Sequence, residues 1–436
     1  MLRGAACLAT PVFGSACGPT DGGANGSGGA STDTGSTVGE AGSSTGSVTG
    51  EAEVGSTGST GDDDTAGETS SSAGPKMDPE IDCLEMQWSW TNDDTPGSSA
   101  SHVAFDGELR VLEREDGVPD AARVLRGFDL NGDPTLAPIV VASGVRVDMA
   151  ARPTGGLLFA LHDGESSALE VWSSAGELVE SVDISSMGDA LDRPVVMAHP
   201  DGSVVFGGDV VGDERESVLQ TRVNDGFSWE RRGDYEFVLA LDGNGSGVTL
   251  ALLGANPFDE GYDVFVAAYD PLGEFLWSVP TGSVSGVLKT SLPSYDFAAQ
   301  GEGAVTLGAL IGVDTETRQG TRDLVVSHYD ANDRMPAWST AVPFVDGPST
   351  TMDDGGIAVV GEQIVAIGGR TIPTIAVLDF NGTVLCSGGL SIPGQDLHIA
   401  DIQPVDADTV VLAGSVTSDG GSAASRTWIA SLTVSP

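Results

Sequence analysis

The residues best able to do chemistry are acidic, and they gather in four polar stretches. These are "GDVVGDERES" (208–217), "NPFDEGYD" (256–263), "GVDTETRQGTRD" (312–323) and "SVTSDGGSAAS" (415–425). Each follows a short apolar run, which predicts a loop after a strand. Grouped carboxylates attract cations or basic partners, more weakly in high salt. The candidate binding residues are Asp209, Asp213, Glu214, Phe258, Asp259, Glu260, Tyr262, Asp263, Asp314, Glu316 and Asp323; a merely solvated loop face is the alternative.

Motifs for catalysis are missing from the sequence. No G-x-S-x-G follows a predicted strand in the folded region, and no H-E-x-x-H is present. Neither Lys76 nor Lys289 follows a glycine, as a phosphate-binding loop requires. The five histidines are scattered singly through different repeats, which indicates surface or loop positions, with gathering at a propeller axis as the alternative. We therefore predict no catalytic residue and no metal site, although pairs of carboxylates leave a carbohydrate-active hydrolase or lyase open as an alternative.

Two short stretches have the oxygen-rich pattern of a calcium loop. "DGNGSG" begins at Asp242 and "DLNGD" begins at Asp129. The first has Leu253 at its twelfth position, where a calcium loop of the EF-hand kind has glutamate. A hairpin turn demands the same Asn, Asp and Gly residues. We expect turns here and no cofactor, with calcium as the open alternative.

The charge of the chain excludes one class of partner. Lys and Arg number 19 against 64 Asp and Glu, for a formal net charge of -45. Binding to nucleic acid requires clustered basic side chains that neutralise phosphates. We expect no nucleic-acid partner and no direct binding to anionic lipid heads.

The first 17 residues have the features expected of an export signal. "MLRGAACLATPVFGSAC" places Arg3, an apolar run and small residues ahead of Cys17, and it resembles a bacterial lipoprotein signal in which that cysteine receives the lipid. Pro11 and Gly14 depart from the usual pattern. The resemblance implies lipidation at Cys17 and a place at the outer membrane or cell surface. A plain cleaved signal or a disordered start remains open.

The remaining cysteines fit an exported protein. Once Cys7 is removed with the signal and Cys17 is lipidated, only Cys83 and Cys386 are left. Two cysteines in an oxidising compartment indicate one disulfide. Two free buried thiols are the alternative.

Residues 18–80 differ in composition from all that follows. They consist of Gly, Ser, Thr, Asp and Glu with almost no apolar side chains, as in "GSTGSTGDDDTAGETSSSAG". Such a segment buries too little apolar surface to offset its ordering entropy. We therefore predict a disordered linker over 18–80 and a folded domain over 81–436.

The folded domain repeats one phrase. "DGSVVFGGDV" (201–210), "GEGAVTLGALIG" (301–312) and "GEQIVAIGGR" (361–370) each join a polar turn to a β-type run. A hairpin such as "AAYDPLGEFLWSVPTG" (267–282) follows the phrase, with Asp and Gly in its turn. The period predicts four-stranded units. Seven such phrases predict an all-β, seven-bladed β-propeller, with a β-sandwich or an open solenoid as alternatives.

The two ends of the domain predict closure into a ring. The last unit, ending "SRTWIASLTVSP", lacks a fourth strand, and "CLEMQWSWTND" (83–93) stands alone after the linker. Pairing of these segments removes exposed sheet edges. It also brings Cys83 close to Cys386 on a neighbouring outer strand.

"AYDPLGEFLW" (268–277) resembles the bacterial propeller repeats related to quinoprotein and WD-type blades, with Trp172, Trp229, Trp277 and Trp338 as the main aromatic markers. With its signal and linker, the chain resembles surface lipoproteins of myxobacteria. The resemblance implies a location more than a chemistry. We predict a monomeric, membrane-anchored binding or scaffold module that recognises an unknown protein, glycan or cation through one face formed by the acidic loops. A structural surface protein without a specific ligand is a further alternative.

Overall fold

The computed structural model describes residues 81–115, 122–143, 146–185, 189–211, 215–223, 226–233, 237–243, 246–255, 261–285, 296–300, 303–308, 323–330, 336–345, 355–369, 372–418 and 424–435. The chain divides into two units, Met1–Glu68 and Thr69–Pro436, and every described residue lies in the second. The predicted signal (1–17) and linker (18–80) lie outside the described residues.

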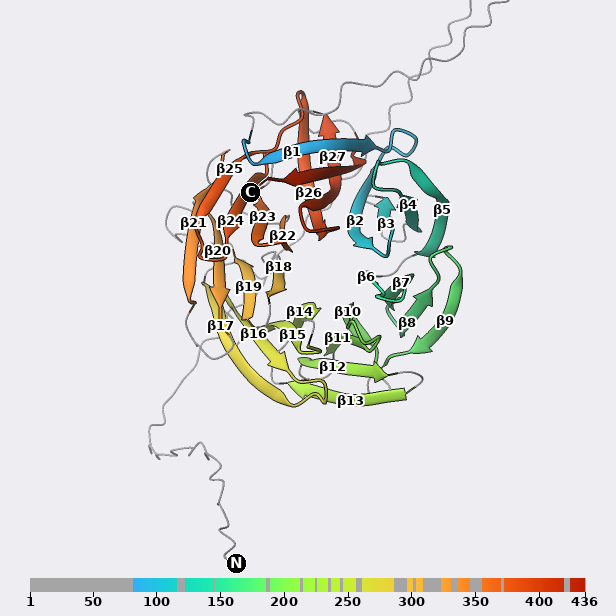
Figure 1. Cartoon of the computed structure of the whole chain (residues 1–436). Helices are drawn as coiled ribbons and strands as arrows, with labels where there is room; N and C mark the ends of the chain where they lie inside the picture. The colour runs from blue at the N-terminus through green and yellow to red at the C-terminus, as the bar shows by residue number, and fades with distance from the viewer. Residues whose placement is uncertain are drawn as a thin grey trace, which may run out of the picture. The chain divides into compact units, whose positions relative to one another are not determined.

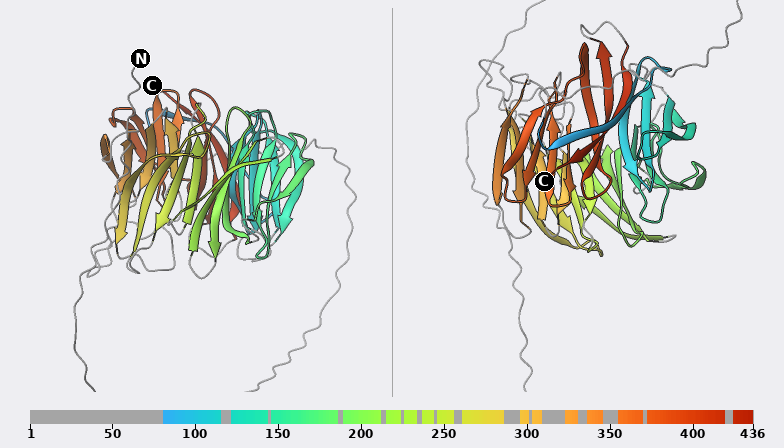
Figure 2. Two further views of the ribbon diagram at one scale, coloured as in Figure 1. Left: turned by 90° about the horizontal axis from the view of Figure 1, so that it is seen from below. Right: turned by 45° about the horizontal axis from the view of Figure 1, so that its top comes forward.

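The described residues form an all-β structure with no helix among them. Their 28 strands make seven four-stranded antiparallel sheets. Figure 1 shows these sheets arranged in a ring around a central axis, and Figure 2 shows the ring from the side, with the strands running between its two faces. The fold is a β-propeller, as the repeats predicted. The predicted hairpin over 267–282 forms the third and fourth strands of its sheet, β16 (Gly261–Tyr269) and β17 (Phe275–Ser285).

Within each sheet the strands run from the axis outward in a fixed order. The first three sheets are β2 (Ser98–Phe105), β3 (Leu109–Glu115), β4 (Ala122–Phe128) and β5 (Pro134–Ser143); β6 (Arg146–Ala151), β7 (Leu157–His162), β8 (Ser167–Trp172) and β9 (Leu178–Asp183); and β10 (Leu191–Ala198), β11 (Val204–Val211), β12 (Arg215–Val223) and β13 (Gly226–Gly233). Next come β14 (Phe237–Gly243), β15 (Thr249–Ala255), β16 and β17; β18 (Asp296–Gln300), β19 (Gly303–Gly308), β20 (Asp323–Tyr329) and β21 (Trp338–Pro343); and β22 (Gly355–Val360), β23 (Gln363–Gly368), β24 (Thr374–Asp379) and β25 (Val384–Gly389). The last sheet is β26 (Gln395–Pro404), β27 (Thr409–Ser418), β28 (Arg426–Val434) and β1 (Leu84–Thr91).

The last sheet joins the two ends of the domain. Strand β1 pairs antiparallel with β28, from Leu84 opposite Val434 to Thr91 opposite Trp428. The N-terminal strand therefore supplies the fourth strand that the final repeat lacks, and the predicted closure is confirmed. Without β1, the edge of β28 would be left open to pairing with another chain.

The hydrophobic core lies between neighbouring sheets. Leu412 and Trp428 of the last sheet are fully buried and belong to one cluster with Val365 and Val377 of the sheet before it. Burial of both faces explains why the middle strands are apolar runs rather than alternating ones. At every junction between sheets, apolar side chains are removed from contact with water. This burial stabilises the ring as a whole.

At three junctions, a tryptophan on the outermost strand of one sheet forms a hydrogen bond to the next sheet. The Trp88, Trp229 and Trp338 indoles donate hydrogen bonds to the carbonyl oxygens of Leu130, Pro271 and Phe380, at 2.7, 3.3 and 3.0 Å. Each acceptor lies 42 residues beyond its tryptophan, in the outer hairpin turn of the following sheet. Trp172, which we grouped with these aromatics, lies instead on the third strand β8 and bonds Glu170.

The turns that receive these tryptophans contain glycines with positive φ. Gly132, Gly273 and Gly382 have φ of 85°, 76° and 80°. A Cβ at Gly132 or Gly382 would lie 2.8 or 2.6 Å from the indole above it. Glycine is required here for two reasons, the left-handed backbone and the close approach of the ring.

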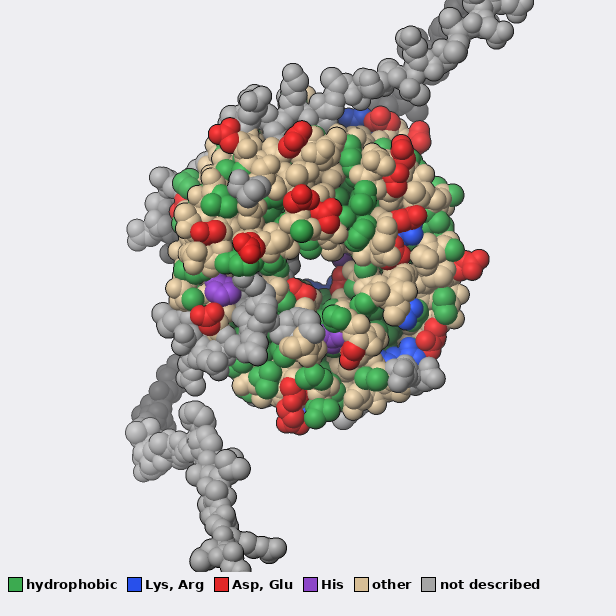
Figure 3. Space-filling model, viewed as in Figure 1, with side chains coloured by type: hydrophobic (Ala, Val, Ile, Leu, Met, Phe, Trp, Pro, Cys, Tyr) green, Lys and Arg blue, Asp and Glu red, His purple; other side chains and the backbone are tan. Residues whose placement is uncertain are grey.

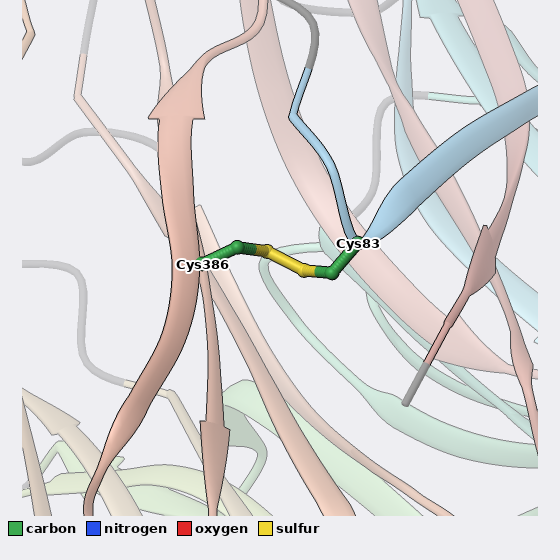
Figure 4. Close-up of a disulfide and its surroundings, with 2 residues drawn as sticks. All are labelled: Cys83 and Cys386. Atoms are coloured by element: carbon green, nitrogen blue, oxygen red, sulfur yellow. A yellow bond between two sulfur atoms is a disulfide. The ribbon is translucent and has the colours of Figure 1, made fainter.

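The predicted disulfide is confirmed. Cys83 and Cys386 are bonded, with Cα atoms 6.1 Å apart, within the usual range for a disulfide. Figure 4 shows the bond running from the residue before β1 to the outer strand β25 of the neighbouring sheet. It therefore ties the closing strand to a second sheet.

Candidate functional site

The main cavity of the described residues lies on the propeller axis. It has a volume of about 660 Å³, in the size range of small-molecule sites. Figure 3 shows it as an open hole through the ring, with acidic and histidine side chains at its edge. Residues of the innermost strands β2, β6, β10, β14 and β26 line it, with Gly355 of β22, and none of the described lining residues is Lys or Arg. We call this space the axial cavity.

Three aspartates of the axial cavity have the same structural role. Asp148, Asp242 and Asp401 each accept a hydrogen bond from the N–H of the following residue, at 2.9, 2.7 and 2.8 Å. The second oxygen of each accepts the backbone N–H of the next sheet's innermost strand: Val196 at 2.7 Å, Ala299 at 2.5 Å and Val103 at 2.8 Å, respectively. These carboxylates therefore join neighbouring sheets at the axis, while the tryptophans join them at the rim.

Burial changes the acidity of two of these aspartates. It raises the pKa of Asp148 and of Asp242 to about 6, although the backbone N–H groups they accept act in the opposite direction. Burial disfavours the charged form of a carboxyl group, and hydrogen bonds to that form favour it. The axial cavity is therefore negatively charged at neutral pH and loses charge under mild acid.

His102 occupies the axial cavity between two polar groups. Its Nε2 lies 3.3 Å from Asp148 Oδ1, and its Nδ1 lies 3.1 Å from Ser101 Oγ. Burial lowers the pKa of His102 to about 4, with smaller contributions from the positive charges of Arg123 and Arg114. The imidazole is therefore neutral at pH 7, and its two nitrogens differ in role: one donates and one accepts.

The structure describes only some of the predicted acidic binding residues. Asp209 lies inside β11 and is 0% exposed, so the expectation that it belongs to an exposed loop is wrong; β11 continues to Val211, past the start of the predicted loop at residue 208. Asp323 begins β20 and is half-buried, and Tyr262 and Asp263 belong to β16 rather than to a loop. The remaining predicted residues, Cys17, Asp213, Glu214, Phe258, Asp259, Glu260, Asp314 and Glu316, lie outside the described residues.

The two calcium-like stretches hold structural carboxylates. Asp129 accepts the backbone N–H groups of Asn131 at 2.8 Å and Asp133 at 2.9 Å, which fixes the hairpin turn. The bond from Asp133 is the main reason that the pKa of Asp129 is lowered. Asp242 faces Ala299 of the next sheet. Within the described part of the chain, no group of three or more His, Cys, Asp or Glu side chains could hold a metal ion.

Sequence reasoning did not predict the axial cavity, although it singled out Asp242 as the start of a calcium-like stretch. A signal for the aspartates is present in "RVDMAA" (146–151) and "HIADIQ" (398–403), where a single acid interrupts an apolar strand. A partly buried acid in a strand requires donors, and here they come from the next sheet. The partnership of His102 with Asp148 has no such signal, because 46 residues and a sheet boundary separate them.

Comparisons with known proteins leave the family open. No protein-family model matches the chain, and no curated protein matches it. Among solved structures, it is similar to one from a study of two prolyl endopeptidases, with a TM-score of 0.46, 11% identity, and coverage of 76% of this chain and 47% of that one. The chain thus spans about half the length of that protein. It is also similar to a protein of unknown function from Dyadobacter fermentans, with a TM-score of 0.43, 10% identity, and coverage of 81% and 100%.

The fold defines the general class. The chain is a β-propeller, and this fold suggests a binding or scaffold role. The described residues include no helix long and apolar enough to cross a membrane.

Proposed function

We propose that this chain is an exported, lipid-anchored binding module: a seven-bladed propeller held at the outer membrane or cell surface through a lipid on Cys17. The seven four-stranded sheets support the blade number. The Cys83–Cys386 disulfide supports an oxidising compartment, because such bonds rarely persist in the cytosol.

The ligand is proposed to be positively charged and to enter the axial cavity. One observation carries this choice: the described lining contains the carboxylates of Asp148, Asp242 and Asp401 and no basic side chain. Low-dielectric walls focus the field of such groups, which raises the local concentration of cations. The acidic loops predicted from the sequence would add to the same field.

The test is a binding titration of the full chain with a tri-arginine peptide and a tri-glutamate peptide of equal length. We expect the basic peptide to bind, with affinity that falls as salt rises, and the acidic peptide not to bind. Gln403 lines the cavity, so Gln403→Lys should weaken binding about tenfold by charge repulsion. Glu362 is exposed between β22 and β23, so Glu362→Gln makes the same change in net charge away from the cavity and serves as the control. Equal affinity for both peptides, or equal effects of the two substitutions, would contradict the proposal.

A further inference from the structure

A hydroxyl, an imidazole and a carboxylate form a continuous chain of contacts in the axial cavity. Ser101 Oγ lies 3.1 Å from His102 Nδ1, and His102 Nε2 lies 3.3 Å from Asp148 Oδ1. All three residues line the cavity. The His102 and Asp148 side chains are 28% and 23% exposed, so a molecule in the cavity can reach this group.

A bulge brings two neighbouring residues to the same place. Successive side chains of a regular strand point to opposite faces. The pairing of β2 with β3 shifts between Ala100 and His102, which leaves Ser101 as the extra residue. A β-bulge of this kind re-aims a side chain. Ser101 and His102 can therefore touch through their side chains although they are adjacent in sequence.

The surrounding groups determine the protonation states of His102 and Asp148. Four groups face or influence His102: Asp148 from β6, Arg114 from β3, Arg123 from β4 and its neighbour Ser101. Above about pH 6 Asp148 is ionised, and its negative charge 3.3 Å from His102 Nε2 favours the tautomer with the proton on that nitrogen, so the lone pair of Nδ1 is directed toward Ser101. Burial and the two arginines keep the imidazole neutral, which is the form that accepts a proton.

We propose that Ser101 is a nucleophile for acyl transfer from esters, with His102 as its general base and Asp148 as the residue that positions His102. Ser101 Oγ attacks the ester carbonyl carbon and its proton passes to His102 Nδ1. The bond to the leaving alcohol then breaks, and that alcohol takes the proton from His102. Water, activated by the same imidazole, hydrolyses the acyl-serine and releases the acid.

The lining of the axial cavity selects the class of ester. Asp242 and Asp401 lie in the same cavity as the Ser101 group, and no basic side chain of the described lining offsets their charge. An ester with an anionic group is repelled there, whereas one with an ammonium or guanidinium group is attracted. The inference therefore assigns cationic esters as substrates.

Ser101 also has a structural contact that competes with this role. Its hydroxyl donates to the carbonyl oxygen of Leu112 at 3.1 Å. A hydroxyl has one proton, so it points either at Leu112 or at His102. In a purely structural role the first bond persists and the oxygen does not react, which is an outcome that labelling can detect.

The chain contains a matched internal control. Ser167 Oγ lies 3.3 Å from His162 Nδ1, and His162 Nε2 lies 3.8 Å from Asp192. The residue types are the same, but Ser167 is 1% exposed, and its hydroxyl exchanges hydrogen bonds with Leu191 at 2.8 and 3.0 Å. This serine should not react.

The test uses the full chain and a phosphonofluoridate probe, followed by intact mass and peptide mapping. In the labelling step the Ser101 Oγ–P bond forms, the P–F bond breaks, fluoride leaves, and the serine proton passes through His102 to solvent. We expect one adduct, on Ser101, and none on Ser167. Ser101→Ala should abolish it, Ser167→Ala should leave it unchanged, and His102→Gln should slow it at least about a hundredfold. Thermal unfolding of each variant shows whether it remains folded.

The role of Asp148 is tested by a measurement that would not change if this residue were only structural. The labelling rate of the wild type should rise with pH through about 6 as Asp148 ionises, and Asp148→Asn should lack this step. Hydrolysis of nitrophenyl esters of equal length then tests the substrate, with the cationic ester expected to exceed the neutral and anionic ones. No adduct on Ser101, or labelling unaffected by His102→Gln in the folded protein, would overturn the proposal. Labelling of Ser101 does not depend on binding of the tri-arginine peptide. Either experiment can therefore fail while the other succeeds, so the two proposals are tested separately.

Discussion

Cys83 and Cys386 are bonded across 303 residues, and the bond joins the start of the closing strand β1 to the outer strand of a different sheet. The ring is thus held at its junction by backbone pairing with β28 and by a covalent link to β25. These two constraints act on the same short segment, and their loss should have measurable effects.

Removal of the disulfide should destabilise the propeller. Loss of a native disulfide typically costs about 2–5 kcal/mol, because the unfolded chain regains freedom that the cross-link removed. We expect a reducing agent to lower the urea midpoint of the wild type and to leave that of the Cys83→Ser/Cys386→Ser variant unchanged. Equal sensitivity of both proteins to reduction would show that the bond does not support the fold.

The tryptophan contacts should make Gly382 intolerant of any side chain. Gly382→Ala places a Cβ 2.6 Å from the Trp338 indole and at a φ of 80°. Gly202 has a similar φ of 86°, and a Cβ there meets nothing within 4 Å. Both alanines bear the left-handed backbone penalty of about 1–2 kcal/mol, but only Gly382→Ala adds overpacking of about 1–3 kcal/mol. Denaturant unfolding of the two variants should differ by the second amount, and equal losses would refute the close packing.

The partly buried carboxyl group of Asp242 should give the fold a pH-dependent contribution. Its folded pKa of about 6 exceeds its ordinary value of 3.8, so the folded state binds the proton more tightly. The resulting stability is present at low pH and is lost as pH rises through 6. Between pH 5 and pH 7 the loss should be roughly 1 kcal/mol.

Asp242→Asn is the variant that isolates this contribution. It should be less stable than the wild type, because an amide offers one acceptor where the carboxylate bonds both Gly243 and Ala299. The measurement is the unfolding free energy of both proteins at pH 5 and pH 7. A wild type with no steeper pH dependence than the variant would contradict the raised pKa.

Lipidation is tested independently of the fold. Cys17→Ser should move the protein from the membrane fraction to the soluble fraction while its thermal unfolding stays the same. A single acyl chain binds membranes only weakly, so full retention predicts more than one chain on the lipidated residue. Membrane association that survives the substitution would argue against Cys17 as the anchor.

More of the fold than of the candidate site could be predicted from the sequence. Strand β1 at Leu84–Thr91 falls within the segment predicted to close the ring, because an isolated strand and an incomplete last repeat are both visible in the chain. The turn at Asp270 was equally readable from its Pro-Leu-Gly residues. Local composition decides such features, so the sequence alone carries them.

The axial cavity depends on packing between sheets, which local composition does not encode. His102 stands alone in "SSASHVAF" (98–105), and only the bulge at Ser101 and the adjacent sheet bring it to Asp148. For Asp209 the error was different: a residue of a strand was predicted to be a binding residue in a loop. It follows two glycines and was assigned to a loop, but those glycines allow close packing within the sheet: a Cβ at Gly208 would lie 3.0 Å from the carbonyl oxygen of Asp192.

If the chain is exported as proposed, the pairing of β1 with β28 also orders events during that export. A chain that crosses the membrane with its amino end first delivers β1 before any other strand and β28 after all of them. Until β28 emerges, β1 has a free edge and must be kept from pairing wrongly, a task suited to a chaperone. The last sheet thereby checks completeness, since a product truncated within it cannot seal the ring and should be recognised by proteases.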